Sequence, residues 1–306
     1  MFQIITSNKT TISGTIRAQV SCTARRCGHG SNRPVNTIQL LLAAVMAVQG
    51  SVGMCRDLPL WEAGLGLFPS TFPAYRGADD QQYYLLPFPY VVYRGDYLRV
   101  DREGLRARLF DTDRVQLNIS ANAAPPARSD DSGARDGMPD LDPAFELGPS
   151  LNVLLAHLSD NHNLKLKLPV RSVIATDLGG TEQAGWIFNP HLKLESKNQF
   201  GGWETGISLG PLFGSKKYHA YYYAVDPQYA TPTRPAYTAS GGYSGTLVQA
   251  SLSRRFDRLW MGGFLRYDNL SGTQFNDSPL FETRHSVMAG FAVAWIFSQS
   301  SRVRPE

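Results

Sequence analysis

This chain has few cysteines and no long apolar segment. Three cysteines occur in 306 residues, and none follows Cys55, so the rest of the chain contains no disulfide and no thiolate metal site. With 18% charged residues and a mean hydropathy of -0.24, the chain is too polar for a helical membrane protein. The net charge is only +4 and the basic residues are scattered, which argues against nucleic-acid binding.

The chain also lacks recognisable catalytic and metal-binding motifs. Its six histidines are dispersed, and no GxSxG, HExxH or CxxC motif is present. The acidic run from Asp130 to Asp142 does not have the spacing of a known calcium loop, so we interpret it as a solvated loop. We therefore expect neither an enzyme nor a protein with a metal or cofactor.

The N-terminal region has the features of an export signal. Ile38–Val48 is too short to span a bilayer but has the length of a signal-peptide core, and small residues follow it from Gly50 to Gly53. We expect residues 1–55 to be a leader that is removed and residues 56–306 to form the mature domain. Lipidation of Cys55 is disfavoured because the bulky Met54 occupies a position where a small residue is needed.

From Trp61 onwards, apolar and polar residues alternate with a period of two. In Ser286–Phe297, large apolar residues alternate with Gly290 and alanines, and in Leu164–Arg171 leucines alternate with lysines. This repetition predicts an all-β fold, a transmembrane antiparallel up-and-down β-barrel with one face towards lipid and one towards the lumen. A soluble β-sandwich is the alternative, but such chains usually carry longer apolar runs or covering helices, and none is evident here.

About twelve strands are expected. They are Trp61–Phe68, Tyr84–Tyr93, Tyr97–Arg102, Leu105–Phe110, Arg114–Ala123, Ala144–Ala156, Leu164–Thr176, Trp186–Glu195, Trp203–Phe213, Tyr243–Arg254, Leu259–Leu270 and Ser286–Phe297. Merging the third and fourth into one bulged strand makes the total odd, and ten strands would then require the loss of another. Tight links such as 111–113 and 256–258 become periplasmic turns, and the long links 125–142, 176–185, 214–242 and 271–285 become external loops.

The charges on the inward face are expected to line the lumen. They are Arg106, Arg108, Glu146, Lys165, Lys167, Arg171, Lys193, Glu195, Glu204, Arg266 and Asp268. Because like charges in one narrow bore repel, we expect cations to pair with Glu146, Glu195 and Glu204 and to brace the lumen. If water does pass, the excess of cations favours anions. The longest external loop is rich in tyrosine and is expected either to cap a pore or to bind molecules outside the cell, with Tyr221, Tyr222, Tyr223 and Tyr229 as candidate contacts.

Five segments resemble one protein family. They are LPFPYVVYRGDYLRV (Leu86–Val100), GLRARLFDTDRVQLNIS (Gly104–Ser120), GMPDLDPAFELG (Gly137–Gly148), YYYAVDPQYATPTRPAY (Tyr221–Tyr237) and NDSPLFETR (Asn276–Arg284). In this order and spacing they resemble the MipA/OmpV outer-membrane proteins, whose namesake is the MltA-interacting protein. The tail Ser298–Glu306 is a departure, since members of the family usually end near the terminal aromatic residue.

The resemblance implies a barrel in the outer membrane of a Gram-negative bacterium, surrounded by lipid. It further implies a scaffold for peptidoglycan remodelling, with a lytic transglycosylase and a bifunctional penicillin-binding protein as partners. Two alternatives stay open on sequence grounds: a narrow channel for small, mildly anionic solutes, and surface binding or adhesion through the external loops.

Overall fold

The computed structural model describes residues 58–95, 98–101, 104–107, 110–112, 114–177, 179–199 and 201–304. The chain divides into two units, Met1–Gln49 and Gly50–Glu306, and every described residue belongs to the second. The predicted leader therefore lies outside the described residues.

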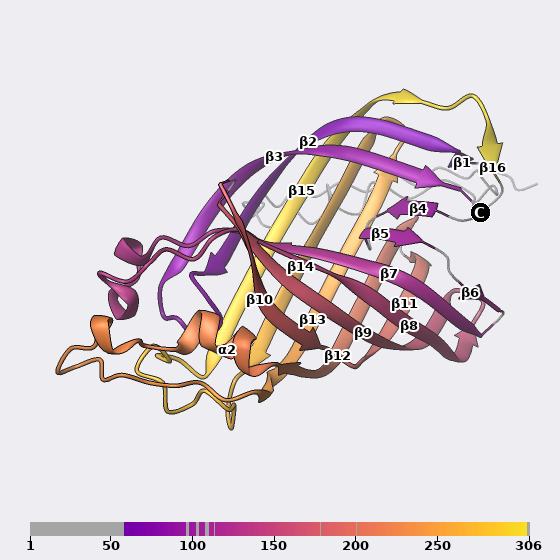
Figure 1. Ribbon diagram of the computed structural model, residues 1–306. Coiled ribbons are helices and arrows are strands. Elements are labelled where there is room, and N and C mark those ends of the chain that lie inside the picture. Colours follow the sequence, from indigo (N-terminus) through magenta and orange to yellow (C-terminus); the bar gives the residue numbers. More distant parts are fainter. Residues whose placement is uncertain are drawn as a thin grey trace, which may run out of the picture. The chain divides into compact units, whose positions relative to one another are not determined.

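The second unit is built almost entirely of antiparallel strands (Figure 1). The strands are β1 (Leu58–Pro59), β2 (Trp61–Pro73), β3 (Gln81–Arg94), β4 (Leu98–Asp101), β5 (Gly104–Ala107), β6 (Phe110–Asp111), β7 (Val115–Ala124), β8 (Ala144–Ser159), β9 (His162–Thr176), β10 (Thr181–Phe188), β11 (His191–Gln199), β12 (Trp203–Gly214), β13 (Gly242–Phe256), β14 (Leu259–Asn269), β15 (His285–Gln299) and β16 (Val303–Arg304). The helices are α2 (Lys216–Tyr223) and the 3-10 turns η1 (Ser129–Asp131), η2 (Gly133–Arg135) and η3 (Pro227–Tyr229).

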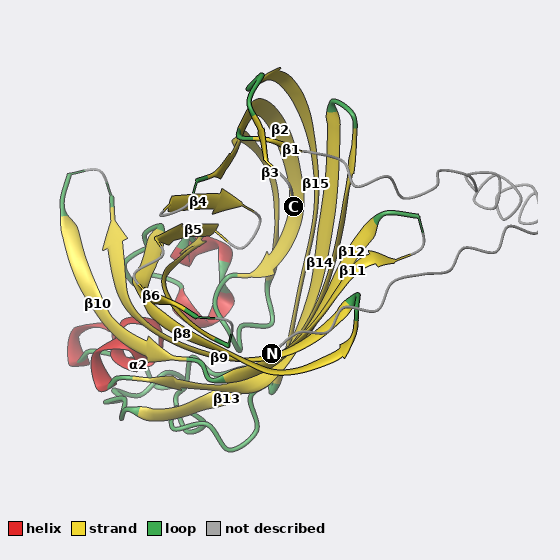
Figure 2. Ribbon diagram, turned by 90° about the vertical axis from the view of Figure 1, so that its right-hand side faces the viewer, coloured by secondary structure: helices red, strands yellow, loops and turns green. Residues whose placement is uncertain are grey.

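One large sheet forms the barrel. Neighbouring strands follow chain order, and β15 pairs with β2 to bring the two ends of the unit together. β5 hydrogen-bonds to β4 and β6 to β7, so the segment 104–111 connects the remaining two edges. Figure 2 shows the strands curving around a common interior. The predicted up-and-down β-barrel is confirmed.

The number of strands depends on two interrupted segments. The described part of the large sheet has fourteen strand segments. β10 and β11 are separated by Asn189 and Pro190, yet both pair with β9 and β12, so they act as one strand. β5 and β6 follow one another in the chain, with residues 108–109 outside the described part, and counting them as one strand gives about twelve strands. The sequence left open whether Tyr97–Arg102 and Leu105–Phe110 form one bulged strand or two. They form two antiparallel strands, β4 and β5, with Leu98 opposite Ala107.

The two faces of the barrel differ as the period of two predicts. Leu65 (61% exposed), Ile207 (53%) and Trp295 (60%) lie on the outer face, where lipid would cover them. Asn118 (5%) and Asp268 (0%) lie on the inner face. No helix among the described residues is both long and apolar enough to cross a membrane.

The two ends of the barrel also differ. Loops 74–80, 125–143, 214–242 and 270–284, together with α2, gather at one end, which we call the loop end (Figure 1). Short turns connect the strands at the other, the turn end. There β1 pairs with β16, so the tail that follows the barrel forms a two-stranded sheet with residues that precede β2. By the rule for outer-membrane barrels, the short turns face the periplasm.

Candidate functional site

The inner wall carries a cluster of three lysines around one glutamate. Lys165 Nζ lies 2.5 Å from Glu195 Oε2, and Lys193 Nζ lies 3.1 Å from Glu195 Oε1. Lys167 Nζ lies 3.7 Å from the same Oε1. Register explains the cluster, because Lys193 stands opposite Lys165 on the neighbouring strand β9. Three ammonium groups therefore converge on the Glu195 carboxylate.

Two further carboxylates of the inner wall hold arginines. Arg171 Nη1 lies 2.9 Å from Glu146 Oε2, which also accepts a hydrogen bond from Asn122. Arg266 donates two hydrogen bonds to the fully buried Asp268, at 2.7 and 2.8 Å. Three of the sequence-predicted acids therefore lie beside predicted cations from the same or the neighbouring strand.

Other predicted lumen residues are less well defined. Glu204 lies near the turn end of β12, opposite Ser253 of β13. Arg106 lies in β5, whose side chains are not among those described, and Arg108 lies outside the described residues.

Two ionic contacts involve residues that the strand pattern did not single out. Arg76 of loop 74–80 donates from Nε to Asp268 Oδ2 at 2.6 Å and from Nη1 to Ser244 Oγ at 3.1 Å. This arginine lies outside the strands, so no alternating pattern identified it. At the turn end, the fully buried Glu62 lies 3.2 Å from both Arg94 Nη1 and Arg255 Nε. The sequence did offer one indication of this site, because Glu62 is the charged residue in a strand made mostly of apolar residues and glycines.

The inner wall is not polar throughout. Phe68 and Phe72 of β2 each lie with ring centroids 6.2 Å from that of Phe264 of β14, and Phe72 is 6.1 Å from Tyr84. A Cβ at Gly290 would come within 2.5 Å of Phe68 and 2.8 Å of Phe264, so only glycine leaves room for these rings. This aromatic group covers the side of the lumen formed by β2, β3, β14 and β15. Sequence reasoning placed bulk on the lipid face and missed it.

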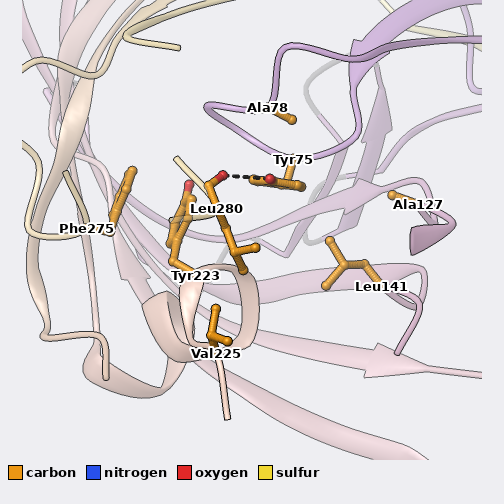
Figure 3. Packing of buried hydrophobic residues seen from close by; sticks show 8 residues of the cluster. All are labelled: Tyr75, Ala78, Ala127, Leu141, Tyr223, Val225, Phe275 and Leu280. Atoms are coloured by element: carbon orange, nitrogen blue, oxygen red, sulfur yellow. Dashed lines mark hydrogen bonds between the residues drawn. The ribbon is translucent and has the colours of Figure 1, made fainter. Parts of the chain in front are cut away.

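The long loops pack together into a cap with its own apolar core. This cluster contains Tyr75, Ala78, Ala127, Leu141, Tyr223, Val225, Phe275 and Leu280 (Figure 3). Tyr75 donates a hydrogen bond to the Leu280 carbonyl at 2.6 Å, and burial raises the pKa of its phenol. Tyr223 donates to the Arg76 carbonyl at 2.7 Å. These hydrogen bonds connect the loops of the cap with one another and connect α2 with loop 74–80, whose Arg76 contacts Asp268.

The helix α2, which the sequence did not predict, lies within this cap. Ser215 caps its N-terminus by accepting a hydrogen bond from Tyr218 N at 3.2 Å. His219 is fully buried, and its Nδ1 lies 2.6 Å from the Ser240 carbonyl. Burial is the main cause of its lowered pKa, so the imidazole is neutral at pH 7. The helix thus fills the loop end of the barrel.

The tyrosines expected either to cap a pore or to contact external molecules lie in or against the cap. Tyr223 is only 2% exposed and belongs to the core of the cap. The Tyr221 hydroxyl accepts a hydrogen bond from Asp142 N at 3.0 Å, and the Tyr222 carbonyl accepts one from the buried Arg135 at 3.1 Å. Half-buried Tyr229 holds Arg234 through its carbonyl. Loop packing hides these rings because their apolar area is more stable away from water.

No arrangement typical of an enzyme emerges among the described residues. They contain no group of three or more His, Cys, Asp or Glu that could hold a metal ion. The chemistry that the lumen does offer is charge pairing, hydrogen-bond donation and aromatic packing.

Solved structures of outer-membrane proteins are among those to which this chain is similar. The outer-membrane channel COG4313 from Pseudomonas putida F1 is 12% identical, with a TM-score of 0.44 over 81% of this chain and 100% of that one. The outer-membrane phospholipase A from Escherichia coli is 10% identical, with a TM-score of 0.31 over 79% of this chain and 95% of that one. A comparison with curated proteins finds no match.

A family model gives the assignment. The model described as MltA-interacting protein MipA matches residues 65–297, nearly the whole barrel. Together with the apolar outer face, this match assigns the protein to the outer membrane of a Gram-negative bacterium. The chain belongs to the MipA family.

Proposed function

We propose that this protein is an interaction scaffold that presents its periplasmic turns and rim to peptidoglycan-remodelling enzymes. The foremost partner is a lytic transglycosylase, and a bifunctional penicillin-binding protein is the second. The family description supports this proposal, because it names an interaction with MltA.

The observation that carries the proposal is the packed loop end of the barrel. The cap core includes fully buried Phe275 and Leu280, and Arg76 ties the cap to Asp268 in the wall. Such packing opposes the free diffusion of solutes through the lumen from one end of the barrel to the other. The side left for a protein partner is then the turn end, which faces the periplasm.

The narrow channel for anions is kept as a second candidate, because Lys165, Lys167 and Lys193 share a single carboxylate. A conducting protein of this kind would need the cap to open.

Binding of a purified lytic transglycosylase to the refolded barrel tests the scaffold. Asp160 and Arg258 are exposed residues of two turns, and Gln228 is exposed on the cap. We expect Asp160→Arg and Arg258→Glu together to weaken capture measured by surface plasmon resonance, whereas Gln228→Arg leaves it unchanged. No capture by the unmodified barrel, or weakening by the cap variant alone, contradicts the proposal.

A further inference from the structure

A small pocket opens in the inner wall, towards the turn end of β7, β8 and β9. Its volume is about 170 Å³, well below the roughly 300–1,000 Å³ of pockets for drug-sized ligands. It is lined by Arg114, Gln116, Asn152, Leu154, Asn163 and Lys165. These residues come from the start of β7, the last half of β8 and the start of β9. A ligand the size of one sugar ring or smaller fits such a volume.

Hydrogen bonds within the wall leave the pocket rich in donors. Ser150 Oγ donates to Asn152 Oδ1 at 2.9 Å, and His157 Nδ1 lies 2.7 Å from Asn163 Oδ1. The carbonyl oxygens of both amides are thus occupied, and their NH₂ groups are left as donors. Gln116 adds a third amide.

The charge of the lining has one sign. Among the described residues that line it, Arg114 and Lys165 are the charged ones, and none of these residues carries a carboxylate. The Arg114 side chain is exposed, and its guanidinium forms no hydrogen bond or ion pair within the described part of the chain. Two further lysines, Lys167 and Lys193, lie beside the pocket and contact the same Glu195 carboxylate as Lys165. A planar guanidinium and an ammonium together are suited to a carboxylate.

We propose that this pocket binds a small carboxylated, hydroxyl-rich solute, a sugar acid in its chemical class. The carboxylate lies between Arg114 and Lys165, the hydroxyls accept from the three amides, and Leu154 contacts the apolar side of the ring. The solute enters from the turn end, the periplasmic side. This site is independent of any protein partner, so its test and the test of the scaffold can fail separately.

Isothermal titration of the refolded barrel in detergent with galacturonate tests the site, with galactose as its neutral match. We expect one galacturonate per barrel, at least about tenfold tighter binding than galactose, and weaker binding at higher salt, since partly exposed charges are screened. Equal affinity for the two sugars, or no binding of galacturonate, overturns the proposal.

Two variants locate the ligand. Arg114→Gln and Lys165→Gln should each weaken galacturonate binding by about tenfold, the loss expected for one charge-assisted hydrogen bond. Arg258→Gln removes an exposed arginine from another turn and should leave the affinity unchanged. Arg114 takes part in no described ion pair, so its variant keeps the test valid if Lys165→Gln fails to fold. An unchanged affinity in Arg114→Gln, or an equal loss in Arg258→Gln, places binding elsewhere.

Discussion

Tyr223 of α2 and Phe275 of loop 270–284 stack face to face, with ring centroids 3.7 Å apart and ring planes 8° apart. Both rings are almost completely buried, and Phe275 also meets His219 and Phe281 edge on. This stack joins two loops that the sequence places far apart. It is the centre of the cap, so the stability of the cap depends on it.

Phe275→Ala should therefore unpack the cap while the strands stay paired. Removing a buried phenylalanine typically costs about 3–5 kcal/mol, and here the loss falls on the loops. Hydrogen exchange should show faster exchange in residues 216–223 and little change in β13 and β14. Gln228→Ala, an exposed cap position, is the control. Equal loss of protection in the barrel strands would mean that cap and barrel unfold together.

Asp268→Asn should destabilise the protein more than Arg76→Gln. The first change leaves Arg76 and Arg266 without their shared carboxylate, and breaking a buried pair in this way costs about 3–5 kcal/mol. The second leaves the Arg266 pair intact. Urea unfolding in detergent measures both. Lys217→Gln serves as the control, because its pair with Glu182 is exposed and should contribute less than about 1 kcal/mol.

Changes on the two faces of the barrel should differ in their effect on insertion. Phe291 is 41% exposed on the outer face, so Phe291→Arg should cost about 2–4 kcal/mol near the middle of the bilayer, and Leu166→Arg should behave alike. Lys167→Gln, on the inner face, should be tolerated within about 1 kcal/mol. Reversible folding into lipid vesicles gives these values, and an equal cost for Lys167→Gln would refute the assignment of faces.

Acid should loosen the cap through His219. Burial lowers the pKa of this imidazole below its ordinary value near 6.5. The hydrogen bond to the Ser240 carbonyl raises the pKa, and the nearby positive charge of Arg76 lowers it, so the net shift is downwards. The unfolded cap therefore binds a proton more readily than the folded one. The contribution of neutral His219 to the stability of the cap is complete above about pH 6.5 and is lost as the pH falls below that value. Hydrogen exchange of α2 between pH 7.5 and 5 should show the loss in the natural protein and a weaker one in His219→Gln.

Charge reversal at Glu195 should raise conductance. Glu195→Lys puts a fourth ammonium group beside Lys165, Lys167 and Lys193, and their repulsion should loosen the wall and admit water. In planar bilayers we expect low conductance from the natural protein and higher conductance from this variant. Glu146→Lys should act similarly by releasing Arg171. A large, stable, voltage-insensitive conductance from the natural protein would favour the channel over the scaffold.

The sequence by itself was sufficient for the barrel. Strand faces follow from a local period of two, so Leu166 and Lys167 could be assigned to opposite faces without any knowledge of the neighbouring strands. The order of the strands followed from the up-and-down topology, in which each strand pairs with the next one in the chain. The paired acids Glu146 and Glu195 were predictable for the same reason, since adjacent strands bring their inward residues together.

Only the tertiary structure decided how the loops pack at the loop end of the barrel. Arg76 and Asp268 are 192 residues apart, and the Tyr223–Phe275 stack joins separate loops. Loop residues have no repeating pattern that fixes the direction of a side chain, so their packing depends on contacts between distant segments. For the same reason the sequence did not predict the pairing of β1 with β16 or the burial of Tyr223 in the core of the cap.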